Sequence, residues 1–185
     1  FGTGTATASE RMRIDGSGRL GIGITSPSAR LHVETTANTM EPVRINDSNN
    51  TNAQTHRIAI HTGGVEVGNI SATRSATVYN TSSDYRLKEN VVAISDGITR
   101  LKTLKPYRFN FKADANTTVD GFFAHEVTAV PEAISGTKDE VNENNEPVYQ
   151  GIDQSKLVPL LVAAVQEAIG KIEVLETEVA ALKAA

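Results

Sequence analysis

The chain has 185 residues, a formal net charge of −4, no cysteine, no tryptophan and only 5 % aromatic residues. The lack of cysteine excludes disulfides and thiol chemistry. The weak negative charge, without any Lys/Arg-rich run, argues against binding to nucleic acid or to an anionic membrane. No apolar stretch approaches the ~20 residues that span a bilayer. So few aromatic residues predict small modules, or a core that other chains complete.

Residues 1–82 are rich in Thr, Ser, Asn and Gly and show no helical periodicity. Short alternating runs bounded by turn residues predict strands. These runs are 11–14, 20–24, 30–34, 42–46, 56–61, 64–71 and 76–79. Each run buries only two or three apolar side chains, which is thin for an independent fold. We therefore expect a β-rich stalk, of the β-helix kind, in which several chains share one core.

The middle of the chain changes character after residue 83. Apolar residues at three- and four-residue steps predict a helix that starts at 86–89 and ends at Pro106, with Gly97 as a weak point. These positions are Val91, Ile94, Ile98, Leu101 and Leu104. Further along, we expect a strand at 107–112, a polar loop at 113–120, a strand end at 121–124 and a short helix at 125–130 that Pro131 stops. Residues 135–147 are polar and acidic and predict an exposed hairpin or loop.

The last thirty residues have an unbroken heptad pattern that predicts a helix over about 155–184. The a positions are Val158, Val165, Ile172 and Val179, and the d positions are Leu161, Ala168, Leu175 and Leu182. Lys171 and Glu178 at g would face Glu176 and Lys183 at e of a parallel neighbour. An amphipathic helix packed on its own domain is the alternative. Branched residues at a with Leu at d favour two strands on this pattern alone.

No other constellation predicts a site. His32, His56, His61 and His125 show no metal-ligand spacing, so we expect no metal and no cofactor. Glu126 and Glu132 are better explained by capping or surface ion pairs than by acid–base chemistry. The glycines of residues 16–23 indicate turns, because no helix and no Gly-Lys-Ser/Thr follows them.

The stretch Ser83-Asp84-Tyr85-Arg86-Leu87-Lys88-Glu89-Asn90 resembles the opening of the chaperone of endosialidase family. This family comprises the self-cleaving C-terminal domains of phage tailspikes, tail fibres and neck appendages. The resemblance extends through residues 104–110, 121–127 and 131–133 to the terminal helix at 157–161, and so covers 83–185. Residues 15–23 with 25–27 resemble a segment that often precedes this domain in phage fibres.

The resemblance implies an α+β architecture: a β-rich trimeric stalk segment, residues 1–82, followed by a small mixed chaperone domain, residues 83–185, that ends in a coiled-coil helix. It implies a homotrimer that brings the upstream fibre of the same chains into register. The expected location is a virion tail fibre or tailspike assembled in the host cytoplasm. A host surface receptor is a further expected partner. A structural trimerisation tip that does not cleave, or a receptor-binding adhesin, are the alternatives.

The resemblance also implies autoproteolysis between Ser82 and Ser83 by a Ser83–Lys88 dyad. Asp84 and Arg86 would support the dyad, as would His125, which matches a histidine of endosialidase-type members where many relatives carry Gln. Ser83 would attack the Ser82 carbonyl in an N-to-O acyl shift, and the ester would then hydrolyse.

Lys88 can take the Ser83 proton only when neutral, which costs roughly 4–5 kcal/mol at pH 7 for an ordinary lysine. Burial in a trimer, or the neighbouring charge of Arg86, would lower that cost. Five residues of regular helix turn by about 500°, so Ser83 and Lys88 would not share a face. Either Ser83 precedes the helix in an extended segment, or Lys88 serves a neighbouring chain. By spacing alone, Ser83 as a helix N-cap, with Asp84 in the first turn and Lys88 in solvent, is the simpler interpretation.

Overall fold

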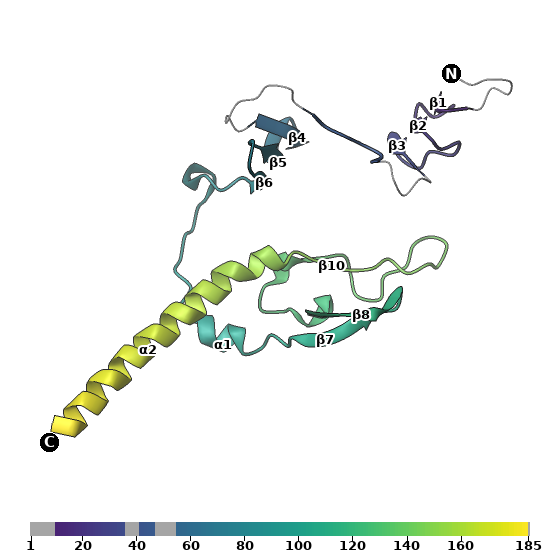
Figure 1. Cartoon of the computed structure of the whole chain (residues 1–185). Coiled ribbons are helices and arrows are strands. Elements are labelled where there is room, and N and C mark those ends of the chain that lie inside the picture. Colours follow the sequence, from purple (N-terminus) through teal and green to yellow (C-terminus); the bar gives the residue numbers. More distant parts are fainter. Residues whose placement is uncertain (1–9, 36–40, 47–54, 185) are drawn as a thin grey trace. The chain divides into compact units, whose positions relative to one another are not determined.

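The computed structural model describes residues 10–35, 41–46 and 55–184 (Figure 1). The chain divides into two compact units, Phe1–Lys88 and Glu89–Ala185. The first unit is built from strands, and the second combines short strands with a long C-terminal helix. The α+β class expected from the sequence is therefore confirmed. The predicted domain boundary before Ser83 lies six residues ahead of the division between the compact units and stays a prediction.

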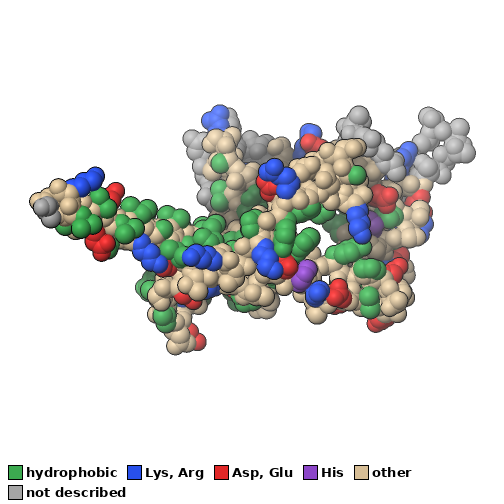
Figure 2. Space-filling model, turned by 90° about the horizontal axis from the view of Figure 1, so that it is seen from below, with side chains coloured by type: hydrophobic (Ala, Val, Ile, Leu, Met, Phe, Trp, Pro, Cys, Tyr) green, Lys and Arg blue, Asp and Glu red, His purple; other side chains and the backbone are tan. Residues whose placement is uncertain are grey.

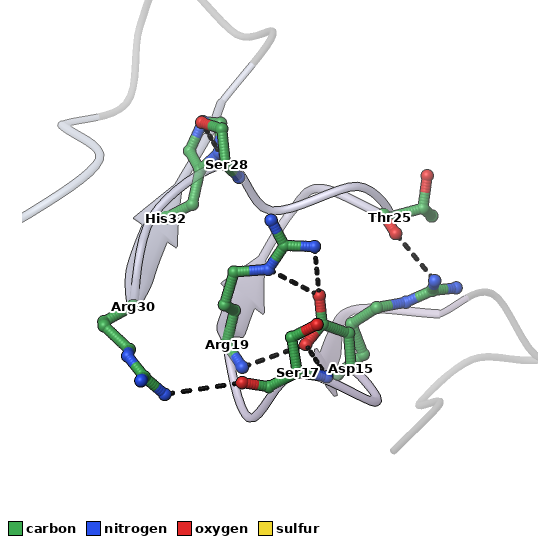
Figure 3. Close-up of polar contacts among 8 residues, drawn as sticks. Asp15, Ser17, Arg19, Thr25, Ser28, Arg30 and His32 are labelled. Atoms are coloured by element: carbon green, nitrogen blue, oxygen red, sulfur yellow. Dashed lines mark hydrogen bonds and ion pairs between the residues drawn. The ribbon is translucent and has the colours of Figure 1, made fainter.

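The first sheet contains β1 (Met12–Ile14), β2 (Leu20–Ile22) and β3 (Leu31–Val33). β1 and β2 are antiparallel, whereas β2 and β3 are parallel. Asp15 organises the β1–β2 turn, because its carboxylate accepts from the backbone N–H groups of Ser17 and Arg19 and pairs with the Arg19 guanidinium at 2.7 Å (Figure 3). Gly18 has a φ of 71°, which glycine adopts without strain. Gly16 and Gly18 thus lie in this turn and Gly23 in a bend, as predicted, whereas Gly21 belongs to β2 and the turn predicted there is wrong.

The second sheet is an antiparallel meander of β4 (Thr55–Thr62), β5 (Val65–Ala72) and β6 (Thr77–Thr81). Its best-buried side chains are polar: Asn69 and Ser71 on β5 are 9 % and 0 % exposed. The strand predicted at 42–46 is wrong. Residues 41–46 form no strand. Alternating apolar and polar residues do not make this segment a strand, because no described strand pairs with it.

The second unit contains an antiparallel hairpin of β7 (Tyr107–Phe111) and β8 (Asp114–Gly121). The strand predicted at 107–112 is confirmed, but the loop predicted at 113–120 is wrong. β8 is polar because most of its side chains face water, and its backbone groups are satisfied by β7. β8 is therefore a strand because it pairs with β7, and its sequence lacks the alternating apolar pattern by which strands are predicted.

The short helix predicted at 125–130 is also wrong. Two 3-10 turns replace it, η2 (Ala124–Glu126) and η3 (Pro131–Ala133). Pro131 begins the second turn, a position where its fixed φ is favourable and its missing N–H costs nothing. The turn between η2 and η3 lets both Val127 and Val130 enter the core, where each is 2 % exposed.

Residues 136–150 form the exposed loop that the sequence predicted. The paired strands β9 (Ile134–Ser135) and β10 (Gly151–Ile152) close it, and a bridge joins Val141 to Pro147 within it.

Helix α2 (Val158–Ala184), preceded by the turn η4 (Gln154–Leu157), confirms the predicted C-terminal helix. Its first turns cover a small core made of Val127, Val130, Ala133, Leu157 and Leu160. Helix α1 (Gly97–Leu101) packs beside it. A Cβ at Gly97 would lie 2.5 Å from the Ala164 nitrogen, so only glycine permits this approach. Glu167 accepts the Ile98 N–H at 3.0 Å and so ties the two helices together.

The long helix predicted from residue 86 to Pro106 is wrong over most of its length. Helical structure is limited to η1 (Tyr85–Leu87) and α1. Lys88 is extended, with φ −122° and ψ 139°, and Asn90 has a left-handed φ of 54°. Both conformations interrupt a helix, so Val91 and Ile94 share an apolar periodicity with α1 without belonging to it.

The two faces of α2 differ sharply. Leu160 and Ala164 are each 2 % exposed against their own domain. The predicted heptad side chains lie on other faces, and seven of the eight are exposed, between 43 % and 78 %: Val158, Leu161, Val165, Ile172, Leu175, Val179 and Leu182. Figure 2 shows hydrophobic side chains along the projecting length of α2. The helix thus packs on its own domain with one face and leaves an apolar stripe uncovered.

Candidate functional site

The segment around the predicted cleavage bond is held on its upstream side by the second sheet. β6 ends at Thr81, but its pairing with β5 continues for one more residue. The Ser82 N–H donates to the Val67 carbonyl at 3.2 Å, and the Ser82 hydroxyl donates to the Glu66 carbonyl at 3.4 Å. Ser82 is therefore anchored to a folded strand.

On the downstream side, a tight turn follows Ser83. Asp84 is extended, with ψ 137°, and caps η1 by accepting the Arg86 N–H at 2.8 Å. The Leu87 and Lys88 N–H groups donate to the carbonyls of Asp84 and Tyr85, both at 3.1 Å. Asp84, rather than Ser83, is the capping residue, so the simpler interpretation of Ser83 as an N-cap is wrong. The serine hydroxyl is left available for another partner.

That partner is Lys88 of the same chain. Its ammonium donates to the Ser83 hydroxyl oxygen at 2.9 Å. Of the two arrangements that the sequence left open, this contact matches the first: Ser83 precedes the helical turn, and η1 with an extended Lys88 folds the lysine back towards it. Ser83 and Lys88 can meet because residues 83–88 do not form the regular helix that would place them on different faces.

Asp84 and Arg86 form an ion pair beside this contact. The Arg86 Nε and Nη2 atoms lie 2.9 and 2.8 Å from the two Asp84 carboxylate oxygens. These hydrogen bonds hold the pKa of the Asp84 carboxyl below its usual range, and the charge of Lys88 adds to the effect. The same pair raises the pKa of Arg86. The Arg86 charge is thus engaged by Asp84, and together the two side chains rigidify the turn that carries Lys88.

The whole segment 81–96 is exposed in the single chain. Its apolar side chains share this exposure: Tyr85 and Leu87 are 81 % and 73 % exposed, and Val91 and Val92 are 82 % and 85 % exposed. Clustered apolar side chains in water are typical of a surface that a partner covers. Ser83 and Lys88 themselves are exposed among the residues that the structure describes.

His125 lies in the other compact unit, at η2, in a row of aromatic rings. Its ring centroid is 6.0 Å from that of Phe123, which in turn lies 4.9 Å from Tyr107. Phe109, Phe123, His125 and Tyr149 are among the residues that line a recess there. The supporting role predicted for His125 stays a prediction. Glu126 accepts from the Tyr107 hydroxyl at 2.8 Å and pairs with Lys105, so it forms the surface contacts expected of it.

One polar cluster on the second sheet is not evident from the sequence. The Glu66 carboxylate lies 3.5 Å from His56 and 3.9 Å from His61, and it accepts from the Asn69 amide at 2.8 Å. Strand pairing of β4 with β5 creates this contact, which the spacing of the histidines does not reveal. Among the described residues, no group of three or more acidic and histidine side chains could hold a metal. No helix of the described part is long and apolar enough to cross a membrane.

Comparison with known proteins gives one match. Residues 83–135 match the family model described as chaperone of endosialidase, which also bears a serine-type peptidase name (Peptidase_S74). No curated protein matches the chain. The match begins at Ser83, the residue at which the Lys88 contact is made, and includes the turn η1 and the hairpin of β7 and β8. Residues 83–135 are therefore similar to the chaperone of endosialidase family, and this match supports a chaperone role.

Proposed function

We propose that this chain is an intramolecular chaperone that trimerises, brings the β-rich segment of a phage tail fibre or tailspike into register, and then cuts itself between Ser82 and Ser83. The observation that carries the cleavage is the 2.9 Å contact from Lys88 to the Ser83 hydroxyl at the first residue of the family segment. The observation that carries assembly is the exposed heptad stripe of α2.

The proposed reaction is one turnover within a chain. The Ser83 oxygen attacks the Ser82 carbonyl carbon, a C–O bond forms, the C–N bond breaks, and the Ser83 nitrogen leaves as a free amine. Water then hydrolyses the ester and returns the Ser83 hydroxyl. A neutral Lys88 amine takes the hydroxyl proton in the first step and returns it to the leaving nitrogen.

Assembly would favour the proposed cleavage, because neighbouring chains would exclude water from the surroundings of Lys88. Lysines in water are charged at neutral pH, and a charged amine accepts no proton. Tyr85 and Leu87 flank Arg86 next to Lys88, and both are exposed. We propose that neighbouring protomers cover these side chains and thereby favour the neutral amine. Cleavage would then follow assembly, so the chaperone would not be lost before its task is complete.

The partner proposed for α2 is two further copies of this chain. The a and d stripe is apolar and unbroken, and the exposed Val162 and Ile169 widen it at the e positions. A wide stripe suits a bundle of more than two helices, because each helix then contacts two neighbours. Glu178 and Lys183 form no ion pair within the described part of the chain, which leaves them free to pair between helices as the heptad pattern predicts.

The cleavage proposal is tested by variants of the dyad. On a denaturing gel, the wild-type protein should give two fragments split at residue 82, whereas Ser83→Ala and Lys88→Ala should stay whole. An uncut wild-type trimer would contradict the proposal. It would favour the second candidate, a structural trimerisation tip that does not cleave, with which the full exposure of Ser83 and Lys88 in the single chain is consistent.

Mixed trimers test whether Lys88 acts within its own chain, as the 2.9 Å contact indicates. Chains with Ser83→Ala and chains with Lys88→Ala, distinguished by a tag, are refolded together. If Lys88 acts in its own chain, neither chain is cut. If the Lys88→Ala chain is cut only when it is mixed with the Ser83→Ala chain, the lysine serves a neighbouring chain.

A further inference from the structure

The strand register just before the proposed cleavage bond is fixed by an unusual buried contact. Asn80 on β6 donates through its side-chain nitrogen to the Asn69 oxygen at 2.9 Å and to the Ser71 hydroxyl at 3.0 Å. Both acceptors lie on β5, and both are buried. Burying polar groups is costly unless they are paired, so this sheet gains specificity rather than simple stability from them. A shift of β6 by one residue would place Asn80 on the opposite face and break both contacts.

A second feature makes the approach of the two strands close at this end. A Cβ on Gly68 would lie 2.6 Å from the Asn80 carbonyl oxygen, so a larger residue there would force the strands apart. Gly68 is paired with Thr81, the last residue of β6. Beyond it, Ser82 continues the pairing through its N–H to Val67 and through its hydroxyl to Glu66. The register lock therefore extends directly to the residue whose carbonyl would be attacked.

We propose that β5 acts as a docking strand for the acyl side of the cleaved bond, and that Asn80 and Ser82 are positioning residues for the attack. The proposal rests on the proposed autoproteolysis. Two separate anchors flank the bond: β5 holds Ser82, and the turn η1 brings Lys88 to Ser83. An intramolecular attack depends steeply on the relative placement of the reacting atoms, so anchoring both sides accelerates it. It follows that β6 in its native register on β5 is a condition for cutting.

The experiment follows fragment formation by purified trimer over time for four variants. Ser82→Ala removes only the hydroxyl contact and should slow cleavage about threefold, whereas Ser82→Thr keeps a hydroxyl and should restore most of the rate. Asn80→Ala removes both lock contacts and should slow cleavage on the order of tenfold. Thr77→Val, at the far and exposed end of β6, is the matched control and should cut at the wild-type rate.

Hydroxylamine distinguishes an effect on the acyl shift from an effect on ester hydrolysis. It captures the ester formed by the acyl shift, so it hastens fragment formation only where ester hydrolysis is the slow step. Placement of Ser82 acts on the shift itself. Fragment formation by Ser82→Ala and Asn80→Ala should therefore be no faster with hydroxylamine than without it. Restoration of the wild-type rate by hydroxylamine would overturn the positioning role.

The outcomes separate this proposal from the one on which it rests. If Ser83→Ala stays whole while Asn80→Ala and Ser82→Ala cut at the wild-type rate, the docking strand is refuted and autoproteolysis stands. If the wild-type protein stays whole, or Ser83→Ala is still cut, the proposed autoproteolysis itself fails. Slow cleavage by both variants, with normal cleavage by Thr77→Val, supports the docking strand.

Discussion

Shortening Leu160 to alanine probes the face of α2 that packs on its own domain. Leu160 is 2 % exposed and lies in the core with Val127, Val130, Ala133 and Leu157. Removing its buried methyl groups loses about 2 kcal/mol of transfer free energy, and the cavity left behind raises the total to about 3–4 kcal/mol. For a domain of this size, about 4–8 °C is lost per kcal/mol, so the thermal midpoint should fall by more than ~12 °C.

Leu175 provides the matched control for Leu160, because the same substitution there acts on a side chain that is 58 % exposed. Leu175→Ala should change the packing within the domain little and should instead weaken association between chains. The assay is thermal unfolding followed by far-UV circular dichroism, with light scattering for the mass of the assembly. Equal losses of stability from both variants, with no change in mass from Leu175→Ala, would refute the division of α2 into an inner and an outer face.

Other substitutions test the remaining parts of the account. Gly97→Val should force α1 away from Ala164 and lower the thermal midpoint, whereas Gly170→Ala, which meets nothing within 4 Å, should stabilise α2 by about 0.5–1 kcal/mol. Asp84→Ala should loosen the turn η1 and slow cleavage about tenfold on a time-resolved gel, with the mass of the trimer unchanged. The rate of cleavage should rise or stay level as the pH rises, and should not fall, because only the neutral form of a lysine base accepts a proton. The depressed pKa of Asp84 means that its contribution to the turn is complete above its ordinary value of 3.8 and is lost only as the pH falls below that, so it adds no acid limb between about pH 5 and 7. A rate that falls as the pH rises from 6 to 8 would contradict a lysine base.

The sequence was most informative where a single periodicity controls the structure. The heptad positions of α2 are spaced by the helix itself, so the helix could be predicted without knowledge of its neighbours. It did not reveal that Leu160 and Ala164 form a second, inner face, because that depends on the domain that they contact. The alternation in residues 56–61 and 64–71 likewise located β4 and β5.

Prediction failed where long-range pairing or a local cap determined the backbone. The polar residues of β8 form a strand only because β7 lies beside them. In the segment 86–96, apolar spacing suggested a helix, but the left-handed Asn90 interrupts it. At the candidate site, the residues Ser83 and Lys88 were identified by resemblance to a family. Their contact could not be predicted from helical spacing, because it depends on a 3-10 turn capped by Asp84. The anchoring of Ser82 on β5 needed the register of the sheet and could not have been found from spacing.

Intact-mass spectrometry of the purified, assembled wild-type protein, beside Ser83→Ala, tests the central claim most directly. Autoproteolysis predicts two masses for the wild type that sum to the full chain plus one water and divide between Ser82 and Ser83. It predicts one full-length mass for Ser83→Ala. A single full-length mass for a wild-type protein that light scattering shows to be trimeric, or a division at any other bond, would contradict it.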